Sequence, residues 1–359
     1  MKIIKNILVL CALLISLPAL SWEKLENGIS LDKSVHEFGD VQLGSGPLSC
    51  RFTFRNDSGK SLLIERVTSS CGCTDVKWTN TVIKSGETGE VSVVYKNDEG
   101  PWPFEKSLTV YLSSQSRPLY LKIRGVCHSK PVQLKEVYTE SLGASLAVKS
   151  LEIKGGNLEQ GGQRCDCFLV ANLSDKAIKL SFTDLPKQVQ IMGLPLTIPA
   201  KKTARVDFCV KADSQLWGKN WYSITPVING AKGKKALKIW SITQMNTSKL
   251  SKEEKRAGSR VAFKSATYSF GKIKAGAKIQ AEFTFSNVGK EEFLIHKIDL
   301  EEGTVCENIA PVKPGGNGVI RAQIDTQNLP KGEALIMIRL ITNSPLRPMI
   351  DLFATGWIE

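Results

Sequence analysis

Short stretches in which apolar and polar side chains alternate follow one another along most of the chain. Phe52 and Phe54 alternate with Thr53 and Arg55, and the stretch 91–96 repeats the pattern. A period of two puts neighbouring side chains on opposite faces of a strand, so each stretch predicts a β-strand with one buried face. Gly, Pro, Asn and Ser break the pattern roughly every 10–15 residues, and amphipathic helical stretches are nearly absent. The pattern predicts an all-β protein.

One arrangement of these stretches occurs three times. The segment 50–64, CRFTFRNDSGKSLLI, matches 281–295, AEFTFSNVGKEEFLI, and a weaker copy includes CFLVANLSDKAIKL at 167–180. The copies are about 115 residues apart, which is the size of a sandwich of some seven strands. We therefore expect three tandem immunoglobulin-like β-sandwich domains.

The domain boundaries follow from these repeats and from the polar stretch before the third copy. The predicted parts are a signal peptide at 1–21, a first sandwich with the SSCGCT motif at 22–129, a divergent second sandwich at 130–247, a linker at 248–260 and a third sandwich at 261–359.

The first residues predict export from the cytoplasm. Lys2 and Lys5 precede the apolar stretch ILVLCALLISLPAL, which is shorter than a typical transmembrane helix. Ala19 and Ser21 have the small side chains of a cleavage site, so we expect cleavage after Ser21. No later stretch of the sequence is long and apolar enough to span a membrane. We expect an exported protein of the periplasm or the cell surface, with no membrane span in the mature chain.

The charge of the chain is strongly basic but not concentrated. The net charge is +13, and removal of Lys2 and Lys5 would lower it to +11. Scattered Lys and Arg are typical of a solvated surface, and the alternative is attraction to an anionic polysaccharide or a membrane surface. No basic stripe is interleaved with aromatic residues, so we expect no nucleic-acid partner.

Export changes how the cysteines are interpreted. The chain has nine cysteines, and Cys11 would leave with the signal peptide. Thiols in oxidising compartments tend to form disulfides. The eight remaining cysteines allow many pairings, and the sequence alone does not choose among them.

Four cysteines of the first domain should meet at one end of its sandwich. Cys50 opens the second strand, Cys71 and Cys73 follow the third, and Cys127 ends the last. The strand directions of an immunoglobulin-type sandwich bring these positions to one pole. We expect one disulfide from Cys50 to a member of the Cys-Gly-Cys motif and another from Cys127 to the other member. These bonds would brace the domain, and Gly72 would let the backbone turn so that its neighbours face different partners.

The second domain carries Cys165, Cys167 and Cys209. Alternation with Phe168 and Phe208 predicts that the three cysteines point away from the core. We expect a cross-strand disulfide from Cys209 to either Cys165 or Cys167, which leaves one thiol over. Cys306 of the third domain is left over as well, and two fates are open to these cysteines: to remain thiols or to link two chains.

The motif SSCGCT at 69–74 carries a resemblance to a known family. It follows an F-x-F-x-N strand and precedes a KSGE turn, and this order resembles the exported bacterial family catalogued as domain of unknown function 1573. That family is similar to the immunoglobulin-like domains of the ASH, hydin and major-sperm-protein group. The first copy matches over most of its length; the third has EEGTVCENIA in place of the motif, and the middle copy lacks it. The resemblance implies fold and export, and it implies no reaction.

Catalytic signatures are weak in this sequence. His36, His128 and His296 have no catalytic neighbour in sequence, and no G-x-S-x-G is present. We therefore predict a non-enzymatic protein without a cofactor or a resident metal. The alternative is a periplasmic protein that uses Cys71 and Cys73, either for thiol–disulfide exchange or to carry copper, because soft thiolates suit copper(I).

The favoured function is a non-catalytic scaffold, adhesion or interaction module of the cell envelope. Its partner would be an envelope protein or polysaccharide. Trp102 and Trp217 occupy matching loops of the first two domains. Each aromatic ring either packs against its own loop or the next domain, or is exposed as a contact for a sugar or a protein partner.

Overall fold

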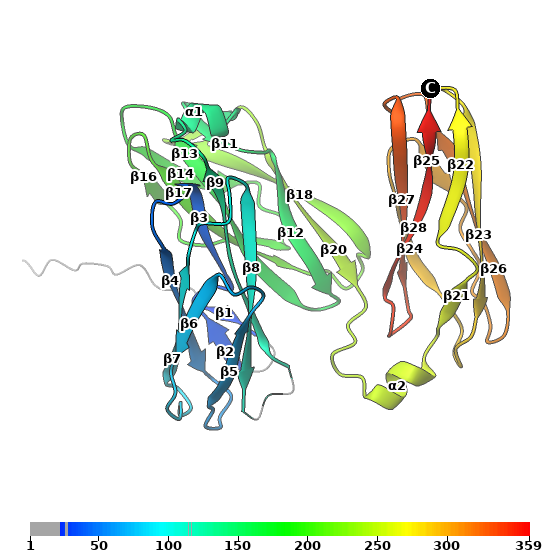
Figure 1. Ribbon diagram of the computed structural model, residues 1–359, viewed down its shortest axis with the longest axis horizontal. Coiled ribbons are helices and arrows are strands. Elements are labelled where there is room, and N and C mark those ends of the chain that lie inside the picture. The colour runs from blue at the N-terminus through cyan, green and yellow to red at the C-terminus, as the bar shows by residue number, and fades with distance from the viewer. Residues whose placement is uncertain (1–21, 26–27, 114, 116) are drawn as a thin grey trace, which may run out of the picture. The chain divides into compact units, whose positions relative to one another are not determined.

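The computed structural model describes residues 22–25, 28–113, 115 and 117–359 (Figure 1). The predicted signal peptide at 1–21 lies outside the described residues. Almost all regular structure is β-strand, arranged in tandem two-sheet sandwiches, which confirms the predicted fold class. The chain divides into two compact units: the described residues up to Val132 together with Met192–Leu196, and Gln133–Ile191 together with Thr197–Glu359.

The first sandwich consists of two sheets with the strand orders β1-β2-β4-β7-β6 and β3-β9-β8-β5. Its strands are β1 (Glu23–Lys24), β2 (Ile29–Leu31), β3 (Val35–Gln42), β4 (Leu48–Asn56), β5 (Ile64–Ser69), β6 (Thr74–Trp78), β7 (Thr88–Tyr95), β8 (Pro103–Leu112) and β9 (Leu119–His128). Phe52 and Phe54 of β4 are buried, whereas Thr53 and Arg55 are partly exposed. The alternation seen in the sequence therefore marks the core face of this strand.

The second sandwich has the orders β10-β11-β13-β17-β15 and β12-β20-β18-β14-β16, and β19 pairs with β18. Its elements are α1 (Leu134–Val137), β10 (Glu140–Gly143), β11 (Leu146–Val148), β12 (Glu152–Glu159), β13 (Gln163–Asn172), β14 (Ile178–Thr183), β15 (Val189–Ile191), β16 (Leu196–Ile198), β17 (Thr203–Lys211), β18 (Gly218–Ile228), β19 (Ala231–Lys232) and β20 (Leu237–Gln244).

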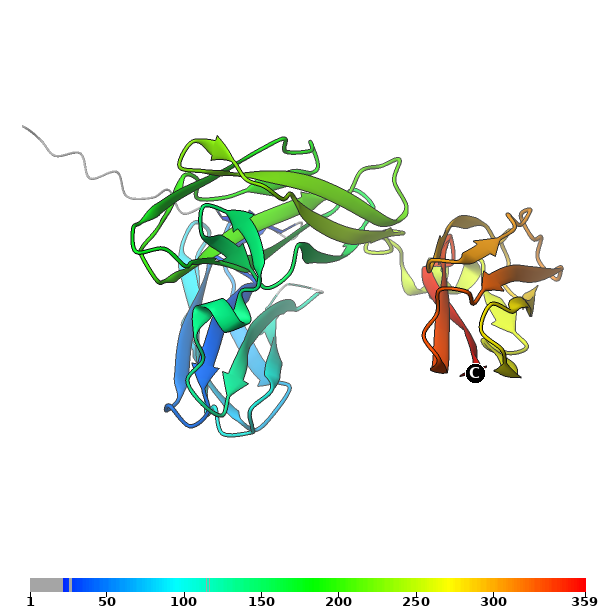
Figure 2. The ribbon, with the colours of Figure 1, turned by 90° about the horizontal axis from the view of Figure 1, so that it is seen from above.

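The third sandwich has two four-stranded sheets, β21-β23-β26-β25 and β22-β28-β27-β24, and Figure 2 views it nearly along its strands. Its strands are β21 (Val261–Phe263), β22 (Thr267–Ile273), β23 (Lys278–Asn287), β24 (Ile295–Leu300), β25 (Thr304–Cys306), β26 (Asn317–Asp325), β27 (Gly332–Thr342) and β28 (Met349–Ile358).

The segment 248–260, expected to be a linker, contains the helix α2 (Lys252–Ala257). Ser251 caps its first turn: the Ser251 side chain accepts a hydrogen bond from the Glu254 backbone N–H, and the Glu254 side chain bonds back to the Ser251 backbone. This reciprocal capping satisfies backbone donors that a short helix would otherwise leave open. Within the described ranges, neither helix has the length and apolar character needed to cross a membrane.

The same strand pairing closes one sheet in all three sandwiches. An early strand runs parallel to the last one, in the pairs β3–β9, β12–β20 and β22–β28. Each pair contains a register shift at a glycine with a left-handed φ: Gly39 at 73°, Gly156 at 81° and Gly271 at 67°. A side chain is strained in this conformation, so the bulge explains why F-G is repeated in the first and third copies.

A buried asparagine ends the second core strand of each sandwich. The Asn56 side chain is fully buried, and its Nδ2 donates to the carbonyl oxygens of Lys60 at 2.7 Å and Ile83 at 3.0 Å. Its Oδ1 accepts from the Ser58 backbone N–H at 3.1 Å. Asn172 and Asn287 repeat the arrangement, with the partners Lys176, Ile198 and Ser174 for one and Glu291, Val312 and Gly289 for the other. One amide thus fixes a tight turn and ties it to a segment further along the chain, which is an isolated β-bridge at Ile83 and Val312 and strand β16 at Ile198.

Within the described residues, the cysteines form two disulfides. Cys71 is bonded to Cys73, so the expected bonds from this motif to Cys50 and Cys127 are wrong. The Cys71 and Cys73 Cα atoms are 5.4 Å apart, and both side chains come from one short turn. A bond within that turn forms without closing a long loop, whereas Cys50 and Cys127 remain thiols. The disulfide therefore does not join the turn to other strands.

The second disulfide joins Cys165 of β13 to Cys209 of β17, which confirms the expected cross-strand bond. The two residues stand directly opposite each other in the register, with Cα atoms 4.0 Å apart. Cys167 lies outside both disulfides.

The prediction that these three cysteines point outward to solvent is wrong, because Cys165, Cys167 and Cys209 are buried. They do alternate with the core residues Phe168 and Phe208, but this face of the sheet is apolar as well. Leu169 and Ala171 lie on it, and helix α1, which the alternation did not predict, packs onto that part of it.

We predict that replacing Asn56 by Ala lowers the free energy of unfolding of the first sandwich by about 2–4 kcal/mol. The substitution leaves the buried carbonyl of Ile83, the part-buried carbonyl of Lys60 and the Ser58 N–H without their partner. Urea unfolding of the full mature chain measures the loss, and Asn80→Ala at an exposed site of the same sandwich is the control. Equal stability of the two variants would contradict the role of the buried amide.

We predict unequal contributions of the two disulfides to stability. The Cys165–Cys209 bond spans 44 positions and should contribute about 4 kcal/mol, whereas the Cys71–Cys73 bond spans 2 and should contribute less than about 2 kcal/mol. Urea unfolding of the two Cys-to-Ala double variants tests this order. A larger loss for Cys71→Ala/Cys73→Ala would show that the short bond braces the domain after all.

Candidate functional site

The four cysteines of the first sandwich lie near one end of it, as the strand directions predicted. Cys50 is opposite Val93 in the register, Thr74 is opposite Tyr95, and Cys127 Sγ donates to Asn97 Oδ1 at 2.7 Å. We call this region the cysteine end: Cys50, Cys71, Cys73, Cys127 and the loop 96–102 between β7 and β8. The loop was not assigned a chemical role from the sequence.

The Cys71–Cys73 disulfide lies in the turn between β5 and β6. Both cysteines are half-buried, and Gly72 between them is exposed. The Thr74 hydroxyl is 3.4 Å from Cys71 Sγ and 3.7 Å from Cys73 Sγ, and Cys71 N–H donates to Ser69 Oγ at 3.4 Å. The bond is therefore held in a short turn and remains within reach of a thiol from solvent.

Gly72 does not have the conformational role expected of it. Its φ is outside the left-handed range, and a Cβ at this position would meet no atom within 4 Å. The turn can therefore form with a larger residue between the two cysteines. The expected need for Gly72 followed from two separate disulfides, which the structure does not have.

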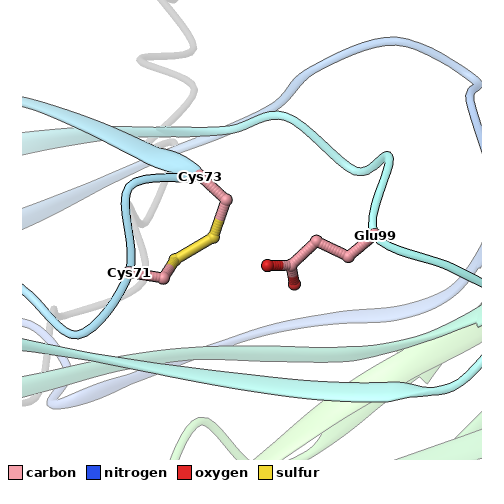
Figure 3. Close-up of side chains that lie close together, drawn as sticks. All are labelled: Cys71, Cys73 and Glu99. Atoms are coloured by element: carbon pink, nitrogen blue, oxygen red, sulfur yellow. A yellow bond between two sulfur atoms is a disulfide. The ribbon is translucent and has the colours of Figure 1, made fainter.

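A carboxylate from the neighbouring loop faces the disulfide. One oxygen of Glu99 and the Sγ atoms of Cys71 and Cys73 all lie within 4.8 Å of one another, and the side chain points towards the sulfurs (Figure 3). No sequence pattern singles out Glu99, which stands in KNDEGPW beside Asp98. Its importance becomes visible only when the β7–β8 loop is folded over the β5–β6 turn.

Two partners hold Glu99 in place. The Tyr95 hydroxyl donates to Glu99 Oε2 at 3.2 Å, and Lys106 Nζ donates to the same oxygen at 2.5 Å. The bond from Lys106 holds the pKa of Glu99 below its ordinary value, so this carboxyl group is ionised. Burial, followed by the charge of Glu99, raises the pKa of Tyr95, which therefore stays a hydrogen-bond donor.

The other two cysteines of this end are protected thiols. Burial raises the pKa of Cys50 to about 12 and also raises that of Cys127, where the charge of Glu99 adds to the effect. Cys127 packs in the core, and Cys50 packs against it. A thiol is a nucleophile only as the thiolate, so neither side chain is prepared for reaction.

The histidines do not complete a site with the cysteines. His128 Nε2 is 2.9 Å from Asp40 Oδ1, and His36 stacks edge-on against Phe38 with ring centroids 4.5 Å apart. His296 lies flat against Trp217 of the second sandwich, with centroids 4.0 Å apart and an angle of 5° between the rings. The partner of each ring is thus Asp40, Phe38 or Trp217, and none of these belongs to the Cys71–Cys73 turn.

The two tryptophans of matching loops have different surroundings. Trp217 is half-buried in its stack with His296, whereas 54% of Trp102 is exposed. Trp102 lies directly over Gly100: a Cβ there would be only 2.0 Å from the indole ring. The Trp102 backbone is also fixed, since its N–H donates to the Gly100 carbonyl and its carbonyl accepts from the Cys127 N–H. Trp102 is thus an exposed ring on an ordered loop of the cysteine end.

Comparison with solved structures shows a likeness in fold. A protein of unknown function from Porphyromonas gingivalis W83 aligns over 60% of this chain and 100% of its own, with 14% identity and a TM-score of 0.51. A human CEP192 ASH/PapD-like domain covers 32% of this chain and 97% of its own at 10% identity and a TM-score of 0.24. The Caenorhabditis elegans protein WR4, of the major-sperm-protein family, covers 28% and 99% at 10% identity and 0.22.

A search of functionally curated proteins gives no match. The family model described as a protein of unknown function, DUF1573, matches residues 29–127 and 261–353. These ranges cover most of the first and third sandwiches and more than half of the chain, and they confirm the resemblance inferred from the SSCGCT motif. The chain belongs to the DUF1573 family.

Proposed function

We propose that the protein is an exported, non-catalytic module of the cell envelope that binds a partner protein through the cysteine end. The observation that carries the proposal is Trp102, an exposed aromatic side chain held on an ordered loop. Large aromatic side chains are the residues that most often dominate binding energy at protein interfaces. The two disulfides support an oxidising location outside the cytoplasm.

The fixed backbone makes Trp102 suited to this role. Ordering a mobile side chain on binding costs conformational entropy, and this cost is smaller when the ring is already held against Gly100. Exposed charged groups of the same loop and strand provide a polar rim: Glu99 is held by Lys106, and Glu105 is paired with Lys122. An apolar centre with a polar rim is the usual anatomy of a protein interface.

We predict that a photoreactive amino acid at position 102 captures one discrete partner in the envelope of cells that make the protein. The same probe at position 357 is the matched control, because Trp357 of the third sandwich is also exposed, at 48%. Trp102→Ala should abolish binding of the captured partner and leave the melting temperature unchanged. Capture that is equal at both positions, or absent at 102, would contradict the proposal.

A second candidate function is thiol–disulfide exchange, favoured by the half-exposed Cys71–Cys73 bond. A thiolate of a client protein would attack one sulfur, forming a mixed disulfide and releasing the other cysteine as a thiolate. The second client thiol would then complete the exchange. The client dithiol is oxidised to a disulfide, Cys71 and Cys73 are reduced to two thiols, and two electrons and two protons are transferred in all.

We predict that a dithiol peptide reduces Cys71–Cys73 in the folded mature chain and leaves Cys165–Cys209 intact. The half-buried bond can be attacked directly, whereas both cysteines of the other bond are buried. Anaerobic incubation, differential alkylation and peptide mapping count the thiols that appear at each position. Cys50→Ala, which removes a protected thiol, should exchange like the unchanged protein. Reduction of Cys71–Cys73 only under conditions that unfold the sandwich would rule out exchange.

A further inference from the structure

The approach of Glu99 to the Cys71–Cys73 bond is not explained by the disulfide itself. A disulfide has no S–H group to donate, so the carboxylate gains no conventional hydrogen bond from the sulfurs that it faces (Figure 3). Glu99 is nevertheless fixed in this direction by Tyr95 and Lys106. Two cysteine sulfurs and one carboxylate oxygen within 4.8 Å of one another are the atom types that hold a metal ion once the S–S bond is opened.

The site requires reduction before it can bind a metal ion through both sulfurs. A dithiol reductant converts the Cys71–Cys73 bond to two thiols and is itself oxidised to a disulfide. A divalent cation then replaces the two thiol protons, which are released to solvent. Two sulfurs bound to one tetrahedral zinc ion lie about 3.8 Å apart, a separation that two side chains of one turn can reach.

The charges of the site favour a divalent ion. Two thiolates and the Glu99 carboxylate carry three negative charges, and Lys106, paired with Glu99, supplies one positive charge. A Zn²⁺ ion balances the remaining two. Zinc binds both thiolate sulfur and carboxylate oxygen. Copper(I), which the sequence analysis considered, prefers soft sulfur ligands, so the Glu99 carboxylate favours zinc. We propose that the reduced protein binds one Zn²⁺ through Cys71, Cys73 and Glu99, with a fourth coordination position open.

The third sandwich provides an internal comparison, because it retains the frame and lacks the whole site. Thr74 and Thr304 hold the same register position, opposite Tyr95 and Ile324 respectively. Counting back from Thr304 gives Gly303 in place of Cys73 and Glu301 in place of Cys71. The two cysteines and Tyr95, which holds Glu99, are therefore missing together.

Lys106 is replaced as well. Ile64 pairs with Leu112, and the equivalent Ile295 pairs with Thr342. Six residues before these partners stand Lys106 in the first sandwich and the buried Ile336 in the third. The inward position is thus occupied by a lysine in the first sandwich, where its amine pairs with Glu99, and by an apolar residue in the third. This joint presence points to one functional unit instead of two independent surface features.

Zinc binding by the full mature chain tests the proposal. The protein is reduced with a phosphine, transferred to reductant-free buffer without oxygen, and titrated with Zn²⁺ against a chromophoric chelator. We expect one equivalent more in the reduced protein than in the reduced Cys71→Ala/Cys73→Ala variant, and loss of this equivalent on oxidation. Glu99→Gln should weaken it roughly tenfold or more. Glu105→Gln is the matched control, since Glu105 is also exposed and paired with a lysine.

Equal zinc content in the reduced unchanged protein and the reduced double Cys variant would overturn the site. An unchanged zinc affinity in Glu99→Gln would show that Glu99 is not a ligand.

Cadmium provides a readout without substitutions, because its thiolate complexes absorb in the ultraviolet. Absence of this band in the reduced protein would also overturn the proposal. The inference does not rest on partner binding through Trp102. A chemical reductant opens the disulfide here, so failure to bind zinc leaves exchange with a client as a separate result.

Discussion

A buried amide at the end of one core strand organises each sandwich. Asn56, Asn172 and Asn287 are fully buried, and each donates to at least two backbone carbonyls and accepts from a backbone N–H two residues further on. Buried backbone groups need partners, and a turn folded back over the edge of a core has few available. An asparagine side chain supplies both a donor and an acceptor in one plane. This requirement is why the asparagine stands in all three copies, including the divergent middle copy, where the pattern reads F-x-V-x-N.

The frame fixed by these amides positions the cysteine end without taking part in its chemistry. The asparagine of the first sandwich ends β4, whereas Cys50 lies near the start of the same strand, so the two features are separated by the length of a core strand. Paired strands hold the β5–β6 turn and the β7–β8 loop close together, because Thr74 is opposite Tyr95. Substitution in the loops can therefore create or remove a site while the core remains intact. The third sandwich, with Gly303 in place of Cys73, shows the same core without the site.

Alternation and repeats predicted the fold because they report which face of each strand is buried, and burial dominates the energetics of a sandwich. Strand direction also predicted correctly that the cysteines gather at one end. The pairing of Cys71 and Cys73 could not be predicted in this way. The alternation of side chains tells which face of a strand a residue occupies, and it does not report the path of the backbone through a turn. Glu99 was missed for a related reason. Its role depends on the conformation of a loop, and loops lack the alternation of apolar and polar residues that identifies the faces of a strand.

Lys106 is the residue from which the site could have been suspected. It is in phase with the buried Leu108 and Val110 of β8, at a position where the alternation requires an apolar side chain. A charged amine at an inward position is unfavourable unless it is paired, and its partner must then be a carboxylate at the same end of the sandwich. Lys106 reaches Glu99 with only 16% of its side chain exposed, and its amine lies 5.8 Å from the centre of the Tyr95 ring. The lysine therefore links the core to the orientation of Glu99: the packing that holds its stem also determines where the carboxylate points, and the carboxylate points at the disulfide.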